Sequence, residues 1–237
     1  MLKNKKNTNS KTLKMIAVVL NLLAAVLLCA EILSSPTQEK QGATSAYEVT
    51  VEDEEPPTSN YKGVAFIGKI CSGKSELAWQ MASILFSPVI SHADYLKEVA
   101  IYAYGMSPTE KDRTLLQSLG KKMREIDPNV FVNITLKRTR YLPTIAINDD
   151  TRFLNEIKKL SEEGWFLVRI HVDENIRQAR IKTLYPNITE EQLTDVSEIE
   201  MDSEEAQMYY NYECANNNEQ DVENVIKSVT CSVIKFK

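Results

Sequence analysis

One short motif constrains the fold of this chain more than any other feature. Residues 68–75 read GKICSGKS, which fits the pattern G-x-x-x-x-G-K-[ST]. An apolar, strand-like run at 63–68 leads into the motif, and helix-forming residues 76–86 follow it. Gly68 and Gly73 allow the backbone to curl, so that amide N–H groups converge beside a helix N-terminus and can bind phosphate. The motif therefore predicts an α/β domain with a nucleotide-phosphate site.

The side chains of this loop have distinct expected roles. Lys74 should reach the outer phosphates as a mobile point charge, and the Ser75 hydroxyl should ligate Mg²⁺. Cys71 is interpreted as a small residue at a variable position rather than as a reactive thiol. The residues expected to bind the triphosphate are Gly68, Lys69, Ser72, Gly73, Lys74 and Ser75.

Downstream of the loop, strand and helix signals alternate, which is typical of a parallel sheet with crossover helices. Strands are predicted at 63–68, 87–92, 144–148, 165–172 and 208–213, and helices at 76–86, 93–104, 109–126, 132–138, 151–163, 174–184 and 219–229. The fold class that follows is a P-loop kinase-like parallel sheet flanked by helices.

Acidic residues follow two of the predicted strands, at the edge where such sheets bind ligands. Asp94 comes after the strand at 87–92, and Lys97 lies one helical turn later. Asp150 comes after the strand at 144–148 and could hold Mg²⁺ through water. Capping of a helix N-terminus remains the alternative role for both aspartates.

Arginines also lie near the predicted carboxyl edge. Arg152 follows Asp150, while Arg177 and Arg180 lie on the helix at 174–184. Transfer of a phosphoryl group between two anions needs positive charge over the reaction centre. We therefore expect these arginines at the site. A solvated helix face is the alternative for Arg177 and Arg180.

The segments before residue 63 differ in composition from the rest of the chain. Residues 1–14 carry five lysines and no acid, and 15–33 is an apolar run of 19 residues interrupted by Asn21 and Glu31. That length is close to the roughly 20 residues of a bilayer span. The polar, acidic stretch 34–62 is expected to be a disordered linker, and 63–237 a P-loop kinase domain.

The basic and apolar segment 1–33 predicts a membrane-associated protein held by a single-pass anchor. A signal peptide and an organelle-targeting leader share the same basic-then-apolar pattern and stay as alternatives. The side of the membrane on which the domain would lie is left open. A homodimer is a further expectation that the sequence leaves open.

Composition excludes several other classes of protein. Of 237 residues, 43% are hydrophobic and 26% charged, which does not fit a wholly disordered chain. The 28 Lys and Arg residues against 33 Asp and Glu give a net charge of −5, so nucleic acid is not an expected partner. Four cysteines without a C-x-x-C pair, and only two histidines, argue against a structural zinc site.

Three further blocks resemble the phage-type deoxynucleoside monophosphate kinases. Residues 91–100 (SHADYLKEVA) are similar to the family's FADPLKE segment, and 115–132 are similar to its LLQ-x-x-G-x-x-x-R-x-x-DP stretch. Residues 149–156 (DDTRFLNE) resemble its D-x-RF-x-NE block. His92 stands where the family usually has Phe and Thr151 where it has Val, and the H-x-SE element is matched only loosely near Glu198.

The resemblance implies transfer of the γ-phosphoryl group of ATP, with Mg²⁺, to a nucleoside or deoxynucleoside 5'-monophosphate. On this reading Lys74, Asp94 and Arg152 are catalytic. Ser75 and Asp150 hold the metal, and Arg177 and Arg180 assist the nucleotide. The acceptor would contact Asp94, Lys97, Gln117, Arg124, Asp150 and Arg152.

Two other functions stay open at this point. Animal-type phosphomevalonate kinase has a similar loop and a DTRR block, so a kinase for another small phosphorylated acceptor is one alternative. A membrane-tethered module that binds ATP without efficient turnover is the other. A surface ion pair with Glu125 or Asp127 is the alternative to an acceptor-binding role for Arg124.

Overall fold

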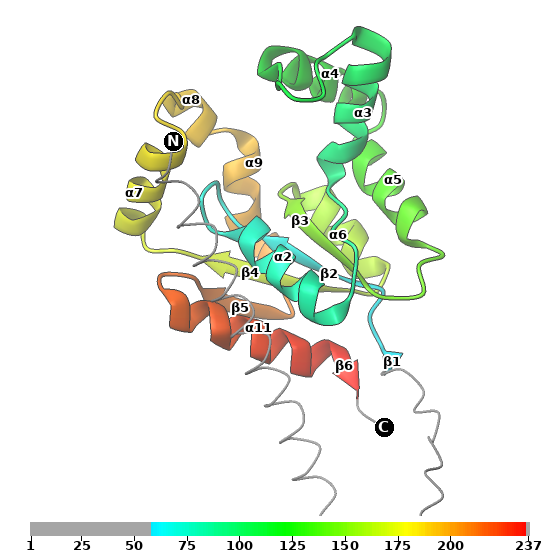
Figure 1. Ribbon diagram of the computed structural model, residues 1–237, viewed down its shortest axis with the longest axis vertical. Coiled ribbons are helices and arrows are strands. Elements are labelled where there is room, and N and C mark those ends of the chain that lie inside the picture. Colours follow the sequence, from blue (N-terminus) through cyan, green and yellow to red (C-terminus); the bar gives the residue numbers. More distant parts are fainter. Residues whose placement is uncertain (1–57, 236–237) are drawn as a thin grey trace, which may run out of the picture. The chain divides into compact units, whose positions relative to one another are not determined.

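A parallel four-stranded sheet forms the centre of the computed structural model, which describes residues 58–235 (Figure 1). The strands are β2 (Gly63–Ile67), β3 (Ala146–Thr151), β4 (Trp165–His171) and β5 (Tyr212–Ala215). They lie in the order β3-β2-β4-β5, and every neighbouring pair is parallel. The predicted α/β class with a parallel sheet is thus confirmed.

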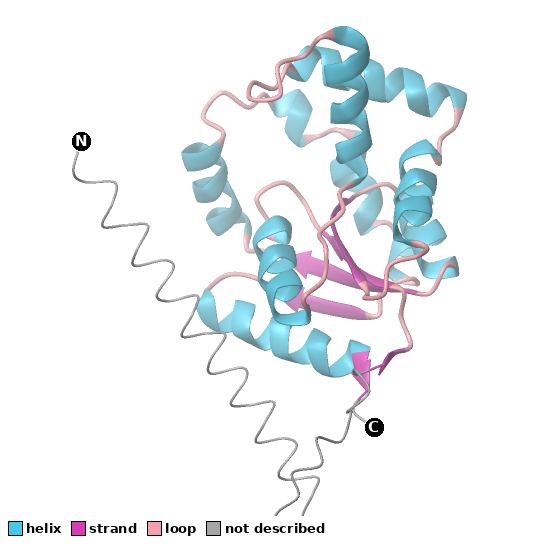
Figure 2. Ribbon diagram, turned by 45° about the vertical axis from the view of Figure 1, so that its right-hand side comes forward, coloured by secondary structure: helices cyan, strands magenta, loops and turns pink. Residues whose placement is uncertain are grey.

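Helices cover both faces of this sheet (Figure 2). On one side, α2 (Lys74–Leu85) lies against β2 and β3, and α11 (Glu219–Val233) packs against α2 and β5. On the other side, α6 (Leu154–Glu162) packs against β4. All five residues of β2 are buried, as expected for a parallel strand covered on both faces.

Alternation of side chains along β2 supplies both halves of the core. Ala65 and Ile67 belong to the cluster on the α6 side, whereas Val64 and Phe66 are fully buried on the opposite face. The cluster on the α6 side also contains Val132, Ala146, Ile157, Leu160, Trp165, Leu167, Met201 and Ala206. A fully packed sheet holds the strand ends, and the loops that follow them, in fixed positions.

Two predicted strands differ from the structure. The stretch 87–92 forms only an isolated parallel bridge between Val89 and Ile147. Pro88 has no N–H to extend the ladder on one side, and on the other the Ile90 carbonyl accepts from the Asn148 side chain instead. This bridge still places the segment at the outer edge of β3. The last strand begins at Tyr212 rather than within 208–211, since Tyr209 and Tyr210 pack against the core instead.

Two groups of helices complete the domain (Figure 1). The first group comprises α3 (His92–Tyr104), α4 (Arg113–Ile126) and α5 (Val130–Thr139). The second comprises α7 (Glu174–Leu184), α8 (Glu190–Leu193), α9 (Val196–Ile199), η1 (Glu200–Asp202) and α10 (Glu204–Gln207). The short helices of the second group occupy the acidic region for which no element is predicted. Thr189, Asp195 and Ser203 cap α8, α9 and α10.

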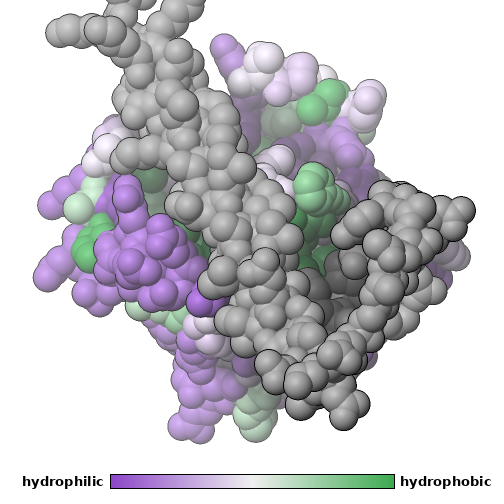
Figure 3. Space-filling model, turned by 60° about the horizontal axis from the view of Figure 1, so that its bottom comes forward, coloured by the Kyte–Doolittle hydropathy of each residue, from purple (hydrophilic) through white to green (hydrophobic). Residues whose placement is uncertain are grey.

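The described part of the chain begins inside the predicted linker. β1 (Thr58–Ser59) pairs antiparallel with β6 (Ile234–Lys235), and Lys62 forms an ion pair with Glu163. The predictions for 1–14, for the anchor at 15–33 and for most of 34–62 lie outside the described residues. Among the described helices, none has the length and apolar character needed to cross a bilayer. Hydrophilic residues predominate on the domain surface visible in Figure 3.

Candidate active site

The loop after β2 has the tight backbone that its sequence predicts. Cys71 and Gly73 both adopt left-handed conformations, with φ of 62° and 90°, and Gly73 is the N-cap of α2. The side-chain amide of Asn216 donates to the carbonyl of Ser72 at 2.8 Å. A Cβ on Gly73 would lie only 2.1 Å from that amide nitrogen. Backbone angle and space therefore both require glycine there.

Lys74 lies under this loop rather than in solvent. Its side chain is buried, and its ammonium donates to the carbonyls of Gly68 at 2.5 Å and Lys69 at 2.9 Å. Burial, followed by the charge of Arg152, lowers the pKa of Lys74 to about 7. Ser75, the next residue, is exposed. The loop thus combines a lysine that can lose its proton near neutral pH with an accessible hydroxyl.

Arg152, which follows β3, is connected to the loop through the carboxylate of Glu198. Its guanidinium pairs with Glu198 of α9 at 2.6 Å, and Glu198 also accepts from the backbone N–H of Ile70 at 2.7 Å. Asp150 and Arg169 both influence the pKa of Lys74, so they lie within electrostatic range of it. Arg152 and Asp150 thus lie near Lys74, and their catalytic and metal-binding roles stay predictions.

The two arginines of α7 also lie beside the loop. Arg180 donates to the carbonyls of Cys71 at 3.4 Å and Asn216 at 2.9 Å. Arg177 is buried and paired with Glu174, which raises the pKa of Arg177, and its Nη1 has no hydrogen-bond partner in the described residues. Burial raises the pKa of the Cys71 thiol against the opposing charges of the nearby cations. A purely solvated helix face does not describe Arg177.

A small polar cavity of about 110 Å³ adjoins the loop. Its cationic lining comes from Lys69, Arg169 and Arg177, and Asp202 and Glu174 supply its acids. Lys69 pairs with Asp202 at 2.8 Å, and Arg169 also contacts Asp202. The cationic residues are thus partly compensated by acids of the helices that follow β4.

The acidic residues predicted to follow the strands both cap the start of α3. Asp94 does so from the first turn of α3, and Asp150 from β3, which extends to Thr151 rather than ending at 148. Both oxygens of Asp150 accept from α3 amides, at 2.7 Å from His92 and 2.9 Å from Ala93. Asp94 accepts from the Ser91 amide and from Lys97, each at 3.0 Å. The capping alternative is therefore realised for both residues. A metal-binding or catalytic role for them stays a prediction.

Arg124 of α4 is held at a well-defined position beside this edge. Its guanidinium lies over the rings of Phe131 and Phe153, with 4.5 Å and 4.4 Å to the ring centroids. It pairs at 3.5 Å with the buried Glu156, rather than with Glu125 or Asp127. Gln117 is exposed two turns earlier on the same helix, and so on the same face.

Glu156 connects the two predicted acceptor arginines. One of its oxygens pairs with Arg124, and the other accepts from the backbone amides of Arg152 and Phe153 at 3.1 Å and 3.2 Å. It therefore caps α6 and fixes the position of Arg124 at once. Asn155 braces the same helix start through Pro128 and Asn129.

The departures from the family pattern at His92 and Thr151 contact each other. The buried His92 ring lies between the hydroxyls of Thr135 at 2.8 Å and Thr151 at 3.1 Å. Thr151 in turn donates to Asn148 at 2.7 Å. A polar contact thus stands where the family pattern has the apolar pair Phe and Val.

Sequence reasoning missed Asn216, which lies in a run of three asparagines that gives no local signal. The sequence marks Glu198 only through the loosely matched H-x-SE element and predicts no contact for it. Arg169 has a signal of its own, because an arginine inside an otherwise apolar strand is unusual. It is buried and donates to the carbonyl of Ile170 at 2.6 Å.

Comparisons with known proteins bear on the fold. No protein-family model and no curated protein sequence matches this chain. The crystal structure of TT1252 from Thermus thermophilus matches with a TM-score of 0.53 and 15% identity, over 73% of this chain and 97% of that one. A dephospho-CoA kinase from Campylobacter jejuni has a TM-score of 0.44 and 14% identity, over 73% of this chain and 98% of that one. A gluconokinase from Sinorhizobium meliloti 1021 has a TM-score of 0.42 and 15% identity, over 73% and 92%.

At these identities the likeness concerns architecture alone. The match to TT1252 spans nearly the whole of that protein, so this chain shares its fold across the described domain. The chemistry open to this chain depends on the side chains around the loop.

Proposed function

We propose that this chain is an ATP-dependent phosphotransferase whose acceptor is a small phosphorylated molecule, with a nucleoside or deoxynucleoside monophosphate as the leading candidate. The observation that carries the proposal is the convergence of cations on one loop. Lys74 comes from α2, Arg152 from the end of β3, and Arg177 and Arg180 from α7. Phosphoryl transfer depends on positive charge placed in advance around the transferred group.

ATP and Mg²⁺ fit the groups present at the loop. The left-handed residues Cys71 and Gly73 bend the backbone at the start of α2, where amides can face phosphate oxygens. Ser75 would ligate Mg²⁺ directly and Asp150 through water, since both Asp150 oxygens already accept from amides. Bound Mg²⁺ would neutralise negative charge on the phosphates.

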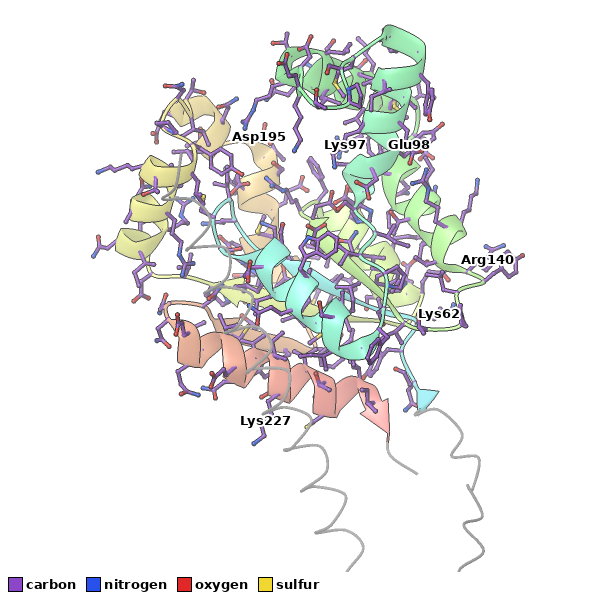
Figure 4. All side chains as sticks on the ribbon, viewed as in Figure 1. Lys62, Lys97, Glu98, Arg140, Asp195 and Lys227 are labelled. Carbon is purple, nitrogen blue, oxygen red and sulfur yellow. The ribbon has the colours of Figure 1, made fainter. Side chains whose placement is uncertain are left out.

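The acceptor would bind beside Arg152, in contact with the predicted acceptor residues of α3 and α4. Arg124 can present a guanidinium fork to two phosphate oxygens, and its aromatic and carboxylate partners hold it in place. Lys97 lies on the side of α3 facing the α7–α9 group, where Asp195 lies (Figure 4). Gln117 and Asp94 are the polar residues available for the sugar or base.

An ATP-binding module without efficient turnover is the second candidate. The observation that favours it is the engagement of Asp94 and Asp150 in capping α3, which leaves fewer free carboxylates for chemistry. Binding of ATP would then occur without transfer. The cations of the loop serve both candidates equally.

Incubation of the full chain with ATP, Mg²⁺ and a panel of nucleoside monophosphates and phosphomevalonate tests these candidates. A nucleoside diphosphate formed from the acceptor supports the leading one. ADP formed only with phosphomevalonate supports the other kinase, and ATP binding without product supports the module. Lys74→Met should abolish product, whereas Lys227→Met, on the exposed side of α11, should not (Figure 4). Equal activity of the two variants would refute the assignment of the loop.

A further inference from the structure

The short helix α9 is attached to the domain by a carboxylate. Glu198 is 3% exposed and is the buried residue of this helix, while Val196 and Ile199 beside it are 56% and 59% exposed. A surface helix normally turns its apolar residues inward and its charged residues outward. In α9 this order is reversed, so the contacts of Glu198 hold the helix in place.

Those contacts use donors that the proposed function assigns to phosphate. One oxygen of Glu198 accepts from the Ile70 N–H inside the loop at 2.7 Å, and the other pairs with Arg152 at 2.6 Å. Glu198 also acts to raise the pKa values of Lys74 and Cys71, which places its charge beside both. Carboxylate and phosphate oxygens are both anionic acceptors and compete for the same donors.

We propose that Glu198 is an internal anion that competes with the nucleotide for the loop, and that α9 leaves the site when ATP binds. This inference rests on the function proposed above. Once phosphate oxygens take the Ile70 N–H and Arg152, a carboxylate left buried without partners is strongly unfavourable. The triphosphate carries more negative charge than one carboxylate and therefore wins the competition, with α9 released into solvent.

The structure supplies a fixed point for this movement. Met201 is fully buried, its carbonyl accepts from the Tyr210 hydroxyl at 2.6 Å, and Asp202 pairs with Lys69. On the other side, α8 is a four-residue helix of the same acidic region. The segment can therefore swing about residues 199–201 while the core contact of Met201 persists. Glu198 is the latch of this segment.

The first test compares Glu198→Gln with Glu200→Gln in the full chain. Glu200 shares the segment and the charge, but its carboxylate accepts from the Leu154 amide of α6, and within residues 58–235 it makes no hydrogen bond or ion pair with the loop. Loss of the competing charge should tighten ATP binding about tenfold, as expected for one charged hydrogen bond. Titration calorimetry measures this, and the control should bind like wild type. Unchanged or weaker ATP binding by Glu198→Gln would overturn the proposal and would indicate a role in positioning Arg152.

The second test needs no variant. Hydrogen exchange of the wild-type chain should become faster at 194–199 when ATP is added and slower at 68–75. Slower or unchanged exchange at 194–199 with bound ATP would overturn the release of α9.

The two experiments also separate this inference from the function on which it rests. ATP binding by Glu198→Gln in the absence of detectable binding by wild type would support the competition. Absence of ATP binding by both proteins would refute the nucleotide site itself, and with it the latch. If wild type binds and turns over ATP but Glu198→Gln shows no gain in ATP affinity, the proposed function is retained and only the competition by Glu198 is refuted.

Discussion

The buried charge of Lys74 should make the stability of this protein depend on pH in a way that one substitution removes. Lys74 is 6% exposed, and burial is the main reason that its pKa falls from 10.5 to about 7. Arg152 lowers the pKa further, whereas Glu198 and Asp150 oppose the shift. The ammonium therefore costs the folded state free energy that the unfolded chain does not incur.

The direction and size of the effect follow from proton linkage. Between about pH 7 and pH 10 the unfolded chain binds more protons at Lys74 than the folded chain does, so the free energy of unfolding rises with pH. Each pKa unit corresponds to about 1.4 kcal/mol, which sets the full cost near 5 kcal/mol well below pH 7. From pH 7 to pH 9 the relief of this cost should raise stability by about 2 kcal/mol.

Lys74→Met isolates this contribution, since Met keeps an unbranched chain and removes the charge. The free energy of unfolding can be measured with urea at about pH 6, 7, 8 and 9. Between pH 7 and 9 that of the wild type should rise by about 2 kcal/mol relative to that of the variant, and below pH 6 the difference between the two proteins should stay constant. Carbonyls of Gly68 and Lys69 lose a donor in the variant at every pH, so the slope and not the offset is the test. Parallel curves for the two proteins would refute a depressed pKa at Lys74. Lys227→Met, which removes an exposed lysine, should run parallel to wild type.

Three further substitutions test other parts of the site. Gly73→Ala should abolish ATP binding and destabilise the protein by roughly 1–3 kcal/mol through backbone strain and overlap. Gly105→Ala, also at positive φ but with open space around its Cβ, should lose less stability and keep ATP binding, and equal losses would contradict the packing argument. Arg124→Lys should weaken acceptor binding at least tenfold and leave ATP affinity unchanged, because losing one bidentate contact costs about 1.4 kcal/mol. Calorimetry that shows equal losses for both ligands would argue against a bidentate contact between Arg124 and the acceptor phosphate. Thr151→Val should destabilise by about 1–3 kcal/mol because it leaves the His92 ring without one partner, and adding His92→Phe should recover part of this loss in a double-mutant cycle.

Local sequence patterns predicted the features that depend on neighbouring residues. The loop, the helix that follows it and the alternation into a parallel sheet are encoded by glycine spacing and apolar periodicity, which act within a few residues. The strand at 87–92 shows the limit of this reasoning, because its composition is strand-like but Pro88 allows only a single bridge. Thr58 and Ser59 fall in the predicted linker but form a strand, because their pairing partners Lys235 and Ile234 lie far away along the sequence.

The sequence predicted which residues gather at the candidate site better than it predicted what their side chains contact. Lys74, Arg152, Arg177 and Arg180 gather at the loop because carboxyl ends of parallel strands meet at one edge of a sheet. Asp94 and Asp150 also lie at this edge, and their side chains cap α3 there. The chemistry of a carboxylate at a strand end is the same for capping and for metal binding, so residue type alone does not separate the two.

The sequence by itself determined that this chain has a tight loop between a strand and a helix of a parallel α/β domain, because a turn with two glycines, a lysine and a serine is a local property. Only the tertiary structure decided which groups face that loop. Glu198 lies 128 positions from Ile70, yet it accepts from that residue's amide, and Asn216 closes the loop from the end of β5. Such contacts arise from the order of strands in the sheet. That order brings together residues that lie far apart in the sequence and share no local pattern.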